Sequence, residues 1–242
     1  MIYNQKSLFP DMFKDAQDKA KEQANKKWLA QKNKNFGLEF CSNATFSGKY
    51  GIPLIKPYIG SIPKLYTTFG NINRIGCSDC CVTGFDYDYV LERMWNHPER
   101  YVETLSHYMC VAEPDFSLKI NNPLSVQIAN TYRSHVLAFY MQEHCINVLP
   151  SMSWGAVPSY DFCFDGHSKG GAVIVSTIGI MKDDRMRMFF KCGFTEMLNR
   201  ILPGAVILYG DINEEMLSWM PKQLDIHHFN HYRFNRARNH GK

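Results

Sequence analysis

The sequence predicts an α/β fold made of repeated β-strand–α-helix units, in which parallel strands are joined by helical crossovers. Short apolar runs that suit buried strands alternate with longer segments of helical periodicity. Several runs end abruptly in carboxylates, hydroxyls or aromatic rings, which is typical of strands that present polar groups at their C-terminal ends. About six or seven such runs fit a TIM-barrel-like fold, complete or incomplete, or an open parallel sheet.

The composition agrees with one large domain flanked by two charged segments. The 242 residues are 45% hydrophobic, which permits a sizeable core and excludes general disorder. We expect a charged helical arm over residues 1–35, a single α/β domain over 36–226 and a basic aromatic tail over 227–242. The net charge of +4 permits an anionic partner without requiring one.

The cysteine pattern and hydropathy predict a cytoplasmic protein. Eight cysteines are scattered along a chain whose N-terminal residues lack a signal-peptide pattern, so we expect reduced thiols. No apolar run approaches the roughly 20 residues of a membrane span, so no membrane partner is expected. Cys77 and Cys80 have the spacing of half a zinc site, but no second pair follows, and Cys163 and His167 complete a site only if the fold brings them close. Buried or edge thiols are therefore favoured, and no metal ligands are assigned.

The elements of the first half are predicted from periodicity and from breaker residues. They are a helical arm over 11–35, an irregular region over 36–76 with one strand at 52–55, a strand over 81–88, two helical pieces divided at Pro98, a strand over 109–115, and a long helix that begins at Asn122 and Pro123. Apolar and aromatic residues at helical spacing predict the buried face of that long helix: Leu124, Ile128, Tyr132, Val136, Phe139 and Tyr140.

The second half continues the alternation. We expect a strand over 146–154, a short helical turn from Pro158, a tight loop over 165–171, a strand over 172–177, a helix that buries Phe190, Phe194, Met197, Leu198 and Ile201, a strand over 205–210, a short helix over 213–220 and a weaker strand near Ile226. The loop over 165–171 resembles a phosphate cradle, but it precedes a strand instead of opening a helix, so this interpretation is disfavoured.

Polar side chains at the strand ends predict a ligand site, because the C-terminal ends of parallel strands share one edge of the sheet. Asp115 and Asp86 are the candidate catalytic residues, which can divide acid and base roles or share a divalent metal. The candidate ligand-binding residues are Ser117, Arg133, Ser151, Ser153, Trp154, Ser176, Thr177 and Tyr209. The alternative is an ordinary polar surface at the strand ends, without a ligand site. In that interpretation Asp115 caps its loop or pairs with Arg133, and Trp154 covers the core.

The C-terminal tail alternates basic and aromatic residues, and Arg233, Arg236 and Arg238 are its candidate nucleic-acid ligands. A solvated tail explains the same composition. For the N-terminal arm, a solvated helix docked by Phe13 and Trp28 is the favoured interpretation, and contact of its lysine-rich end with nucleic acid or a partner subunit is the alternative.

Several segments resemble a known family of domains of unknown function, family 4417, which is met in phages, plasmids and bacterial genomes. The resemblance covers residues 48–210 and is carried by Phe85-Asp86-Tyr87-Asp88, Pro114-Asp115-Phe116-Ser117, Asn130-Thr131-Tyr132-Arg133, Val148-Leu149-Pro150 with Ser153-Trp154, Phe162-Cys163-Phe164-Asp165-Gly166, Val175-Ser176-Thr177-Ile178-Gly179 and Tyr209-Gly210. It implies a mobile-element setting and supplies neither an activity nor a catalytic residue.

The leading hypothesis is a mobile-element-associated enzyme or small-molecule binder whose polar pocket takes a ligand with a sugar, base or phosphate. Whether the protein is an enzyme is left open, and no cofactor is assigned. The alternatives are a nucleic-acid-binding accessory protein of a phage or plasmid, or a protein that sequesters a host factor or signalling nucleotide.

Overall fold

The computed structural model describes residues 18–19, 21–23, 36–73 and 76–230. The chain divides into two units, residues 1–42 and 43–242. In the first unit, residues 18–19 and 21–23 are helical, and a 3-10 helix, η2, spans Leu38–Phe40. The rest of the expected helical arm lies outside the described residues, as do Arg233, Arg236 and Arg238 of the tail.

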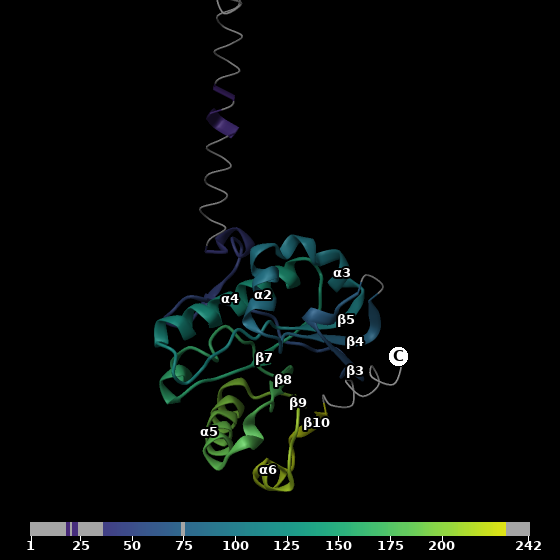
Figure 1. Ribbon diagram of the computed structural model, residues 1–242, viewed down its shortest axis with the longest axis vertical. Helices are drawn as coiled ribbons and strands as arrows, with labels where there is room; N and C mark the ends of the chain where they lie inside the picture. Colours follow the sequence, from purple (N-terminus) through teal and green to yellow (C-terminus); the bar gives the residue numbers. More distant parts are fainter. Residues whose placement is uncertain (1–17, 20, 24–35, 74–75, 231–242) are drawn as a thin grey trace, which may run out of the picture. The chain divides into compact units, whose positions relative to one another are not determined.

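The second unit alternates strands and helices, as the sequence predicts (Figure 1). Its elements are β1 (Phe46–Ser47), β2 (Ile52–Pro53), β3 (Leu65–Thr68), η3 (Phe69–Asn71), β4 (Cys77–Thr83), α2 (Asp88–Asn96), η4 (Pro98–Arg100), α3 (Val102–Ser106), β5 (Tyr108–Ala112), α4 (Leu124–Glu143), β6 (Val148–Leu149), β7 (Ser151–Met152), η5 (Val157–Asp161), β8 (Ala172–Ser176), η6 (Ile180–Lys182), α5 (Asp184–Ile201), β9 (Ala205–Tyr209), α6 (Glu214–Trp219) and β10 (Asp225–Phe229). In the described part of the chain, none of the helices is both long and apolar enough to cross a membrane.

The strands form two parallel four-stranded sheets in sequence order, β3-β4-β5-β6 and β7-β8-β9-β10. Pro150 divides what the sequence predicts as one strand over 146–154, because proline has no N–H to donate to a ladder. Its carbonyl still accepts a hydrogen bond from Ile174 N at 2.9 Å, on the second sheet. Among the described residues no ladder joins β3 to β10, so the sheets are open and form no closed barrel.

Three apolar clusters stabilise this arrangement. One lies between the first sheet and helices α2 to α4, and another between the second sheet and α5 and α6. The third joins the inner faces of both sheets and includes Cys110, Leu149, Ile174 and Ile207. Because successive strand residues face opposite ways, Val111 and Val148 on the same strands belong to the helix-side cluster.

Two features of the first half differ from the sequence prediction. The region over 36–76 contains a sheet strand, β3, besides the short β2, which pairs antiparallel with β1. β3 has only four residues, and of these only Tyr66 and Thr67 are buried. A strand this short and of mixed polarity gives no recognisable pattern in the sequence.

The buried face of α4 also differs from the predicted one. Leu124 is exposed, whereas a stripe of polar residues at helical spacing is buried: Gln127, Asn130, Thr131, Ser134 and His135. Thr131 and Ser134 satisfy their hydroxyls on the helix carbonyls one turn earlier. Polar side chains that a helix buries against a sheet need hydrogen-bond partners or a ligand, because an unpaired buried polar group is costly.

Candidate functional site

A large cavity with a volume of about 680 Å³ lies at the C-terminal ends of β7 and β8. Four of the side chains predicted from strand ends line it: Asp115, Ser153, Trp154 and Ser176. They come from three segments, the residues after β5, those after β7 and the end of β8. The structure therefore brings these four predicted side chains together around one cavity.

Asp115 is positioned by the close approach of the chain after β5 to the end of β4. Gly84 permits this approach, because a Cβ there would lie 2.5 Å from Glu113 O and 2.6 Å from Pro114 Cα. The Asp115 amide donates to Gly84 O at 3.2 Å. Loss of water around the carboxyl raises the pKa of Asp115 to about 7, with smaller contributions from the charges of Glu113 and Asp88 and an opposing hydrogen bond from Ser153.

The rest of the cavity combines an aromatic wall with two cations. Trp154 packs on Phe190 and Phe164, with ring centroids 5.4 and 6.1 Å apart. Lys119 and Arg185 also line the cavity. The cavity thus offers one carboxyl, two hydroxyls, a flat ring and two positive charges, a combination that suits a polar ligand of nucleotide or sugar-phosphate size.

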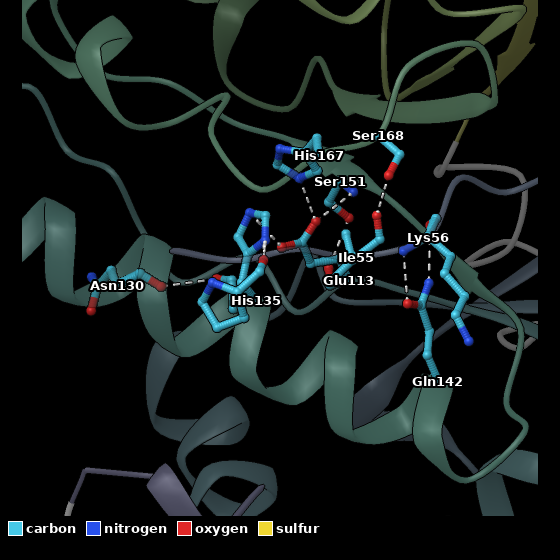
Figure 2. A network of polar contacts seen from close by, with 11 residues as sticks. Ile55, Lys56, Glu113, Asn130, His135, Gln142, Ser151, His167 and Ser168 are labelled. Carbon is cyan, nitrogen blue, oxygen red and sulfur yellow. Dashed lines mark hydrogen bonds and ion pairs between the residues drawn. The ribbon is translucent and has the colours of Figure 1, made fainter. Parts of the chain in front are cut away.

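A second, fully buried group lies beside Asp115 and consists of Glu113, His135 and His167 (Figure 2). The exposed fractions of these side chains are 2%, 1% and 3%. Glu113 Oε2 lies 2.8 Å from His167 Nε2, and Glu113 Oε1 lies 3.4 Å from His135 Nε2. The ligand atoms of the three residues all lie within 4.8 Å of one another, which is compatible with a shared metal ion.

The three residues come from elements that meet where the first sheet passes to the second. Glu113 directly follows β5 and faces the helix layer, as Val111 does, and His135 is on α4. The Ser151 amide and hydroxyl bind the Glu113 side chain and carbonyl, at 3.2 and 2.8 Å. Ser151 was predicted to orient a ligand, and here it anchors Glu113.

The loop over 165–171 supplies His167 and is held by the segment around β2. Ile55 N donates to Gly166 O at 2.8 Å, and Ser168 Oγ donates to Ile55 O at 2.7 Å. Gly166 has a positive φ of 78°, and a Cβ there would lie 2.8 Å from His135 Nδ1. The glycine therefore permits both the turn and the contact between the loop and the His135 ring.

The buried group has defined charges. Against the cost of burial, the two histidines and the hydrogen bonds from His167 and Ser151 hold the pKa of Glu113 below its usual value. Burial lowers the pKa of His135 to about 4, against the opposite effect of Glu113. Glu113 is therefore a carboxylate at neutral pH, and His135 is a neutral imidazole.

Asp86, Ser117 and Arg133 make contacts away from the cavity lining. Asp86 Oδ2 accepts a hydrogen bond from Gly70 N at 2.7 Å, so it caps η3. The Ser117 amide and hydroxyl both donate to Asp88 Oδ1. Arg133 pairs with Glu92 and lies over the Phe116 ring, 3.9 Å from its centroid. Arg133 thus anchors α4 to α2 and does not pair with Asp115.

Thr177 and Tyr209 lie in the packed region at the ends of β8 and β9. Thr177 N and Oγ1 both donate to Tyr209 O. The Tyr209 ring stacks on Phe229 with centroids 5.7 Å apart and also contacts Phe85 and Tyr66. Burial raises the pKa of Tyr209, so its hydroxyl stays protonated at neutral pH.

Comparison with known proteins places the chain in a family. The model of the domain of unknown function DUF4417 matches residues 44–230. The chain belongs to the DUF4417 family. The Gene 1 protein of Mycobacterium phage L5 is 34% identical over 125 residues, which are 52% of this chain and 55% of that protein. The Gene 1 protein of Mycobacterium phage D29 is 30% identical over 185 residues, which are 76% of this chain and 68% of that protein. No solved structure matches the chain.

The matched region of DUF4417 includes the cavity and the buried Glu–His–His group. Both relatives are phage proteins. The comparisons therefore support a phage-associated member of the family, in line with the resemblance drawn from the sequence. Cys77 and Cys80 take no part in this site, and within residues 36–73 and 76–230 they join no group of three metal-ligating side chains.

Sequence reasoning missed Glu113, His135 and His167 as a group. Each carried a usable signal: Glu113 is a carboxylate that directly ends an apolar run, and His135 belongs to the polar stripe of α4. His167 stands in the glycine-rich loop that was considered only as a phosphate cradle or a zinc-site fragment. None of these signals shows that the three residues meet.

Proposed function

We propose that this DUF4417 protein binds, and acts on, a small phosphorylated ligand that carries a flat base or a sugar. The observation that supports this function is the convergence of Asp115, Ser153, Trp154 and Ser176 in one cavity at the C-terminal ends of parallel strands. Ligands of α/β proteins bind at such strand ends, in cavities of this size.

The side chains have distinct roles in this proposal. Lys119 and Arg185 bind the phosphate, because both are cations in the cavity wall. Trp154 contacts the flat part of the ligand, and the hydroxyls of Ser153 and Ser176 orient it. Asp115, which accepts a hydrogen bond from Ser153, is the acid or base that faces the ligand.

Ligand identification comes first, from native mass spectrometry of protein purified from cells. A panel of ribonucleotides and sugar phosphates is then tested by calorimetry. For a ligand that binds, Asp115→Asn is expected to weaken binding or turnover at least about tenfold, because a charge-assisted hydrogen bond contributes roughly 1.5–3 kcal/mol. Asp161→Asn, an exposed carboxylate outside the cavity lining, is the matched control and should behave as the wild type.

The phosphate contact has its own test. Arg185→Gln and Lys119→Gln are expected to lower affinity for the phosphorylated ligand and to leave affinity for its dephosphorylated form unchanged. Equal loss for both forms would contradict the assignment of these cations to the phosphate. Unchanged ligand binding in Asp115→Asn, with a melting temperature close to that of the wild type, would contradict the proposed site as a whole.

A further inference from the structure

The group formed by Glu113, His135 and His167 lies outside the large cavity, and the proposed function does not use it. We propose that these three residues bind one divalent transition-metal ion, of the zinc, iron or manganese type, through a Glu113 oxygen and the two Nε2 atoms. This inference goes beyond the proposed function, because metal binding can be measured without any ligand in the large cavity.

The residue types and their spacing suit such an ion. Two imidazoles and one carboxylate are a common ligand set for zinc and non-haem iron. Two atoms that coordinate one metal at about 2.1 Å lie roughly 3.0–3.4 Å apart in octahedral or tetrahedral sites. Glu113 Oε1 lies 3.4 Å from His135 Nε2 and Glu113 Oε2 lies 2.8 Å from His167 Nε2, so the carboxylate presents a different oxygen to each histidine at close to this spacing.

The hydrogen bonding of His135 points to a cation. His135 Nδ1 lies 2.9 Å from Pro53 O, and a carbonyl only accepts, so Nδ1 carries the proton. The other ring nitrogen, Nε2, is the one left to bind an ion. This atom is buried, has no hydrogen-bond partner among the described residues and faces the Glu113 carboxylate. A metal ion between His135 Nε2 and the Glu113 carboxylate would give both buried groups a coordinate bond.

The supporting contacts have the form found around metal ligands. Histidines that bind metals generally donate their second ring N–H to a carbonyl or carboxylate, as His135 does to Pro53. Ser151 N binds the Glu113 carboxylate, and Ser168 Oγ donates to Ile55 O (Figure 2). Together with the bond from Ile55 N to Gly166 O, this contact fixes the loop that carries His167. The Glu113 side chain and the loop of His167 are thus held in place, whereas the second ring nitrogen of His167, Nδ1, is buried with no hydrogen-bond partner among the described residues.

Space for one ion or one water-sized species is present beside the group. A cavity of about 20 Å³ is lined by all three residues together with Asp115 and Ser153. This volume accommodates about one water-sized species. A metal bound here would share that small cavity with Asp115, which also lines the large one.

The test compares the full chain with two ligand variants, His167→Gln and Glu113→Gln, and with one control. His144→Gln is the control, because His144 is an exposed histidine at the end of the same helix that carries His135. Each protein is stripped with a chelator, dialysed against Zn²⁺ or Co²⁺, and its bound metal is measured by mass spectrometry. Mg²⁺ serves as the ion that this ligand set disfavours.

We expect the wild type and His144→Gln to bind one equivalent more than the two ligand variants, since thiols and tail histidines remain in all four proteins. Zn²⁺ should also raise the melting temperature of the wild type and the control, but not of the ligand variants. Equal metal content and equal thermal shifts in all four folded proteins would overturn the proposal and leave the group as a buried ion-pair network.

Should a variant fail to fold, the wild type decides the question. X-ray absorption of the chain loaded with less than one equivalent of Co²⁺ reports the ligands of its tightest site. Imidazole nitrogens together with oxygen support the proposal. Sulfur ligands, or water oxygens alone, overturn it, because they would place the ion at the cysteines or in solvent.

Discussion

At the scale of residues, two carboxyls only two positions apart have opposite environments. Glu113 faces histidines that stabilise its charge, whereas Asp115 has lost most of the water around its carboxyl and lies near other carboxylates. A pair whose environments push pKa values in opposite directions is the usual arrangement for dividing charged and proton-carrying roles. Asp115 is the member of the pair that reaches the large cavity.

The cysteines differ from these carboxyls, because burial makes most of them unreactive. Burial raises the pKa of Cys80 to about 12 and that of Cys163 to about 12, so both stay protonated. Cys145 and Cys192 are exposed. In native protein treated with a disulfide reagent, we expect these two to react quickly and Cys80 and Cys163 only as fast as the protein unfolds.

Peptide mapping by mass spectrometry measures this reactivity site by site. The double variant Cys145→Ser/Cys192→Ser should lose the fast phase and keep the slow one. Fast labelling of Cys163 in native protein would contradict its packing at the wall of the small cavity, which Cys163 also lines.

At the scale of elements, α5 shapes the large cavity through its contact with Trp154. Gly193 lets the helix approach the indole, because a Cβ there would overlap the Trp154 ring at Nε1. We expect Gly193→Ala to destabilise the protein by about 1–3 kcal/mol, since the indole must move within a packed wall. Thermal unfolding measures this loss, and Trp fluorescence reports the displaced ring.

Thr195→Ala is the matched control for this change. Thr195 is an exposed residue of the same helix, so its substitution should alter stability by no more than about 0.5 kcal/mol. Equal stability of Gly193→Ala and the wild type would show that Trp154 moves freely, and the aromatic wall proposed for the ligand would then lack a fixed position.

Periodicity predicted most elements, because helices and buried strands repeat their apolar pattern locally. The strand before Asp115, the break at Pro98 and the helix that buries Phe190, Phe194 and Met197 all follow from such patterns. The buried face of α4 was predicted only in part: Val136 is buried as expected, but the polar residues of this face have partners in distant segments, Pro53 for His135 and Ser117 for Asn130. Such partners are set by tertiary contacts that no local pattern contains.

The distinction between local pattern and tertiary contact also explains which site residues could be predicted from the sequence. Ser153, Trp154 and Ser176 could be found because each follows a strand, and the ends of parallel strands meet by topology. His135 and His167 could not, because one lies inside a helix and the other in a loop before a strand. Both histidines meet Glu113 near Ser151. This is the place where the chain passes from the first sheet to the second at Pro150.

At the scale of the whole molecule, the second sheet extends into the C-terminal tail that the sequence predicts from residue 227. His227, His228 and Phe229 belong to β10, which pairs with β9 along its whole length. Removal of residues 231–242 keeps this strand, so we expect a melting temperature within a few degrees of the full chain. Truncation after Gly210 would remove β10 and the buried Met216 and Met220, and this shorter chain should not fold.

The truncation after Asn230 then tests the nucleic-acid hypothesis in a folded protein. If Arg233, Arg236 and Arg238 bind phosphates, the full chain should bind a single-stranded oligonucleotide with an affinity that falls steeply with salt. The truncated chain should bind more weakly and with a shallower salt dependence, and the triple Arg→Gln variant of the full chain should match it. Equal affinity and salt dependence in all three proteins would exclude the tail as a nucleic-acid contact. Phosphate recognition would then be confined to the large cavity with Lys119 and Arg185.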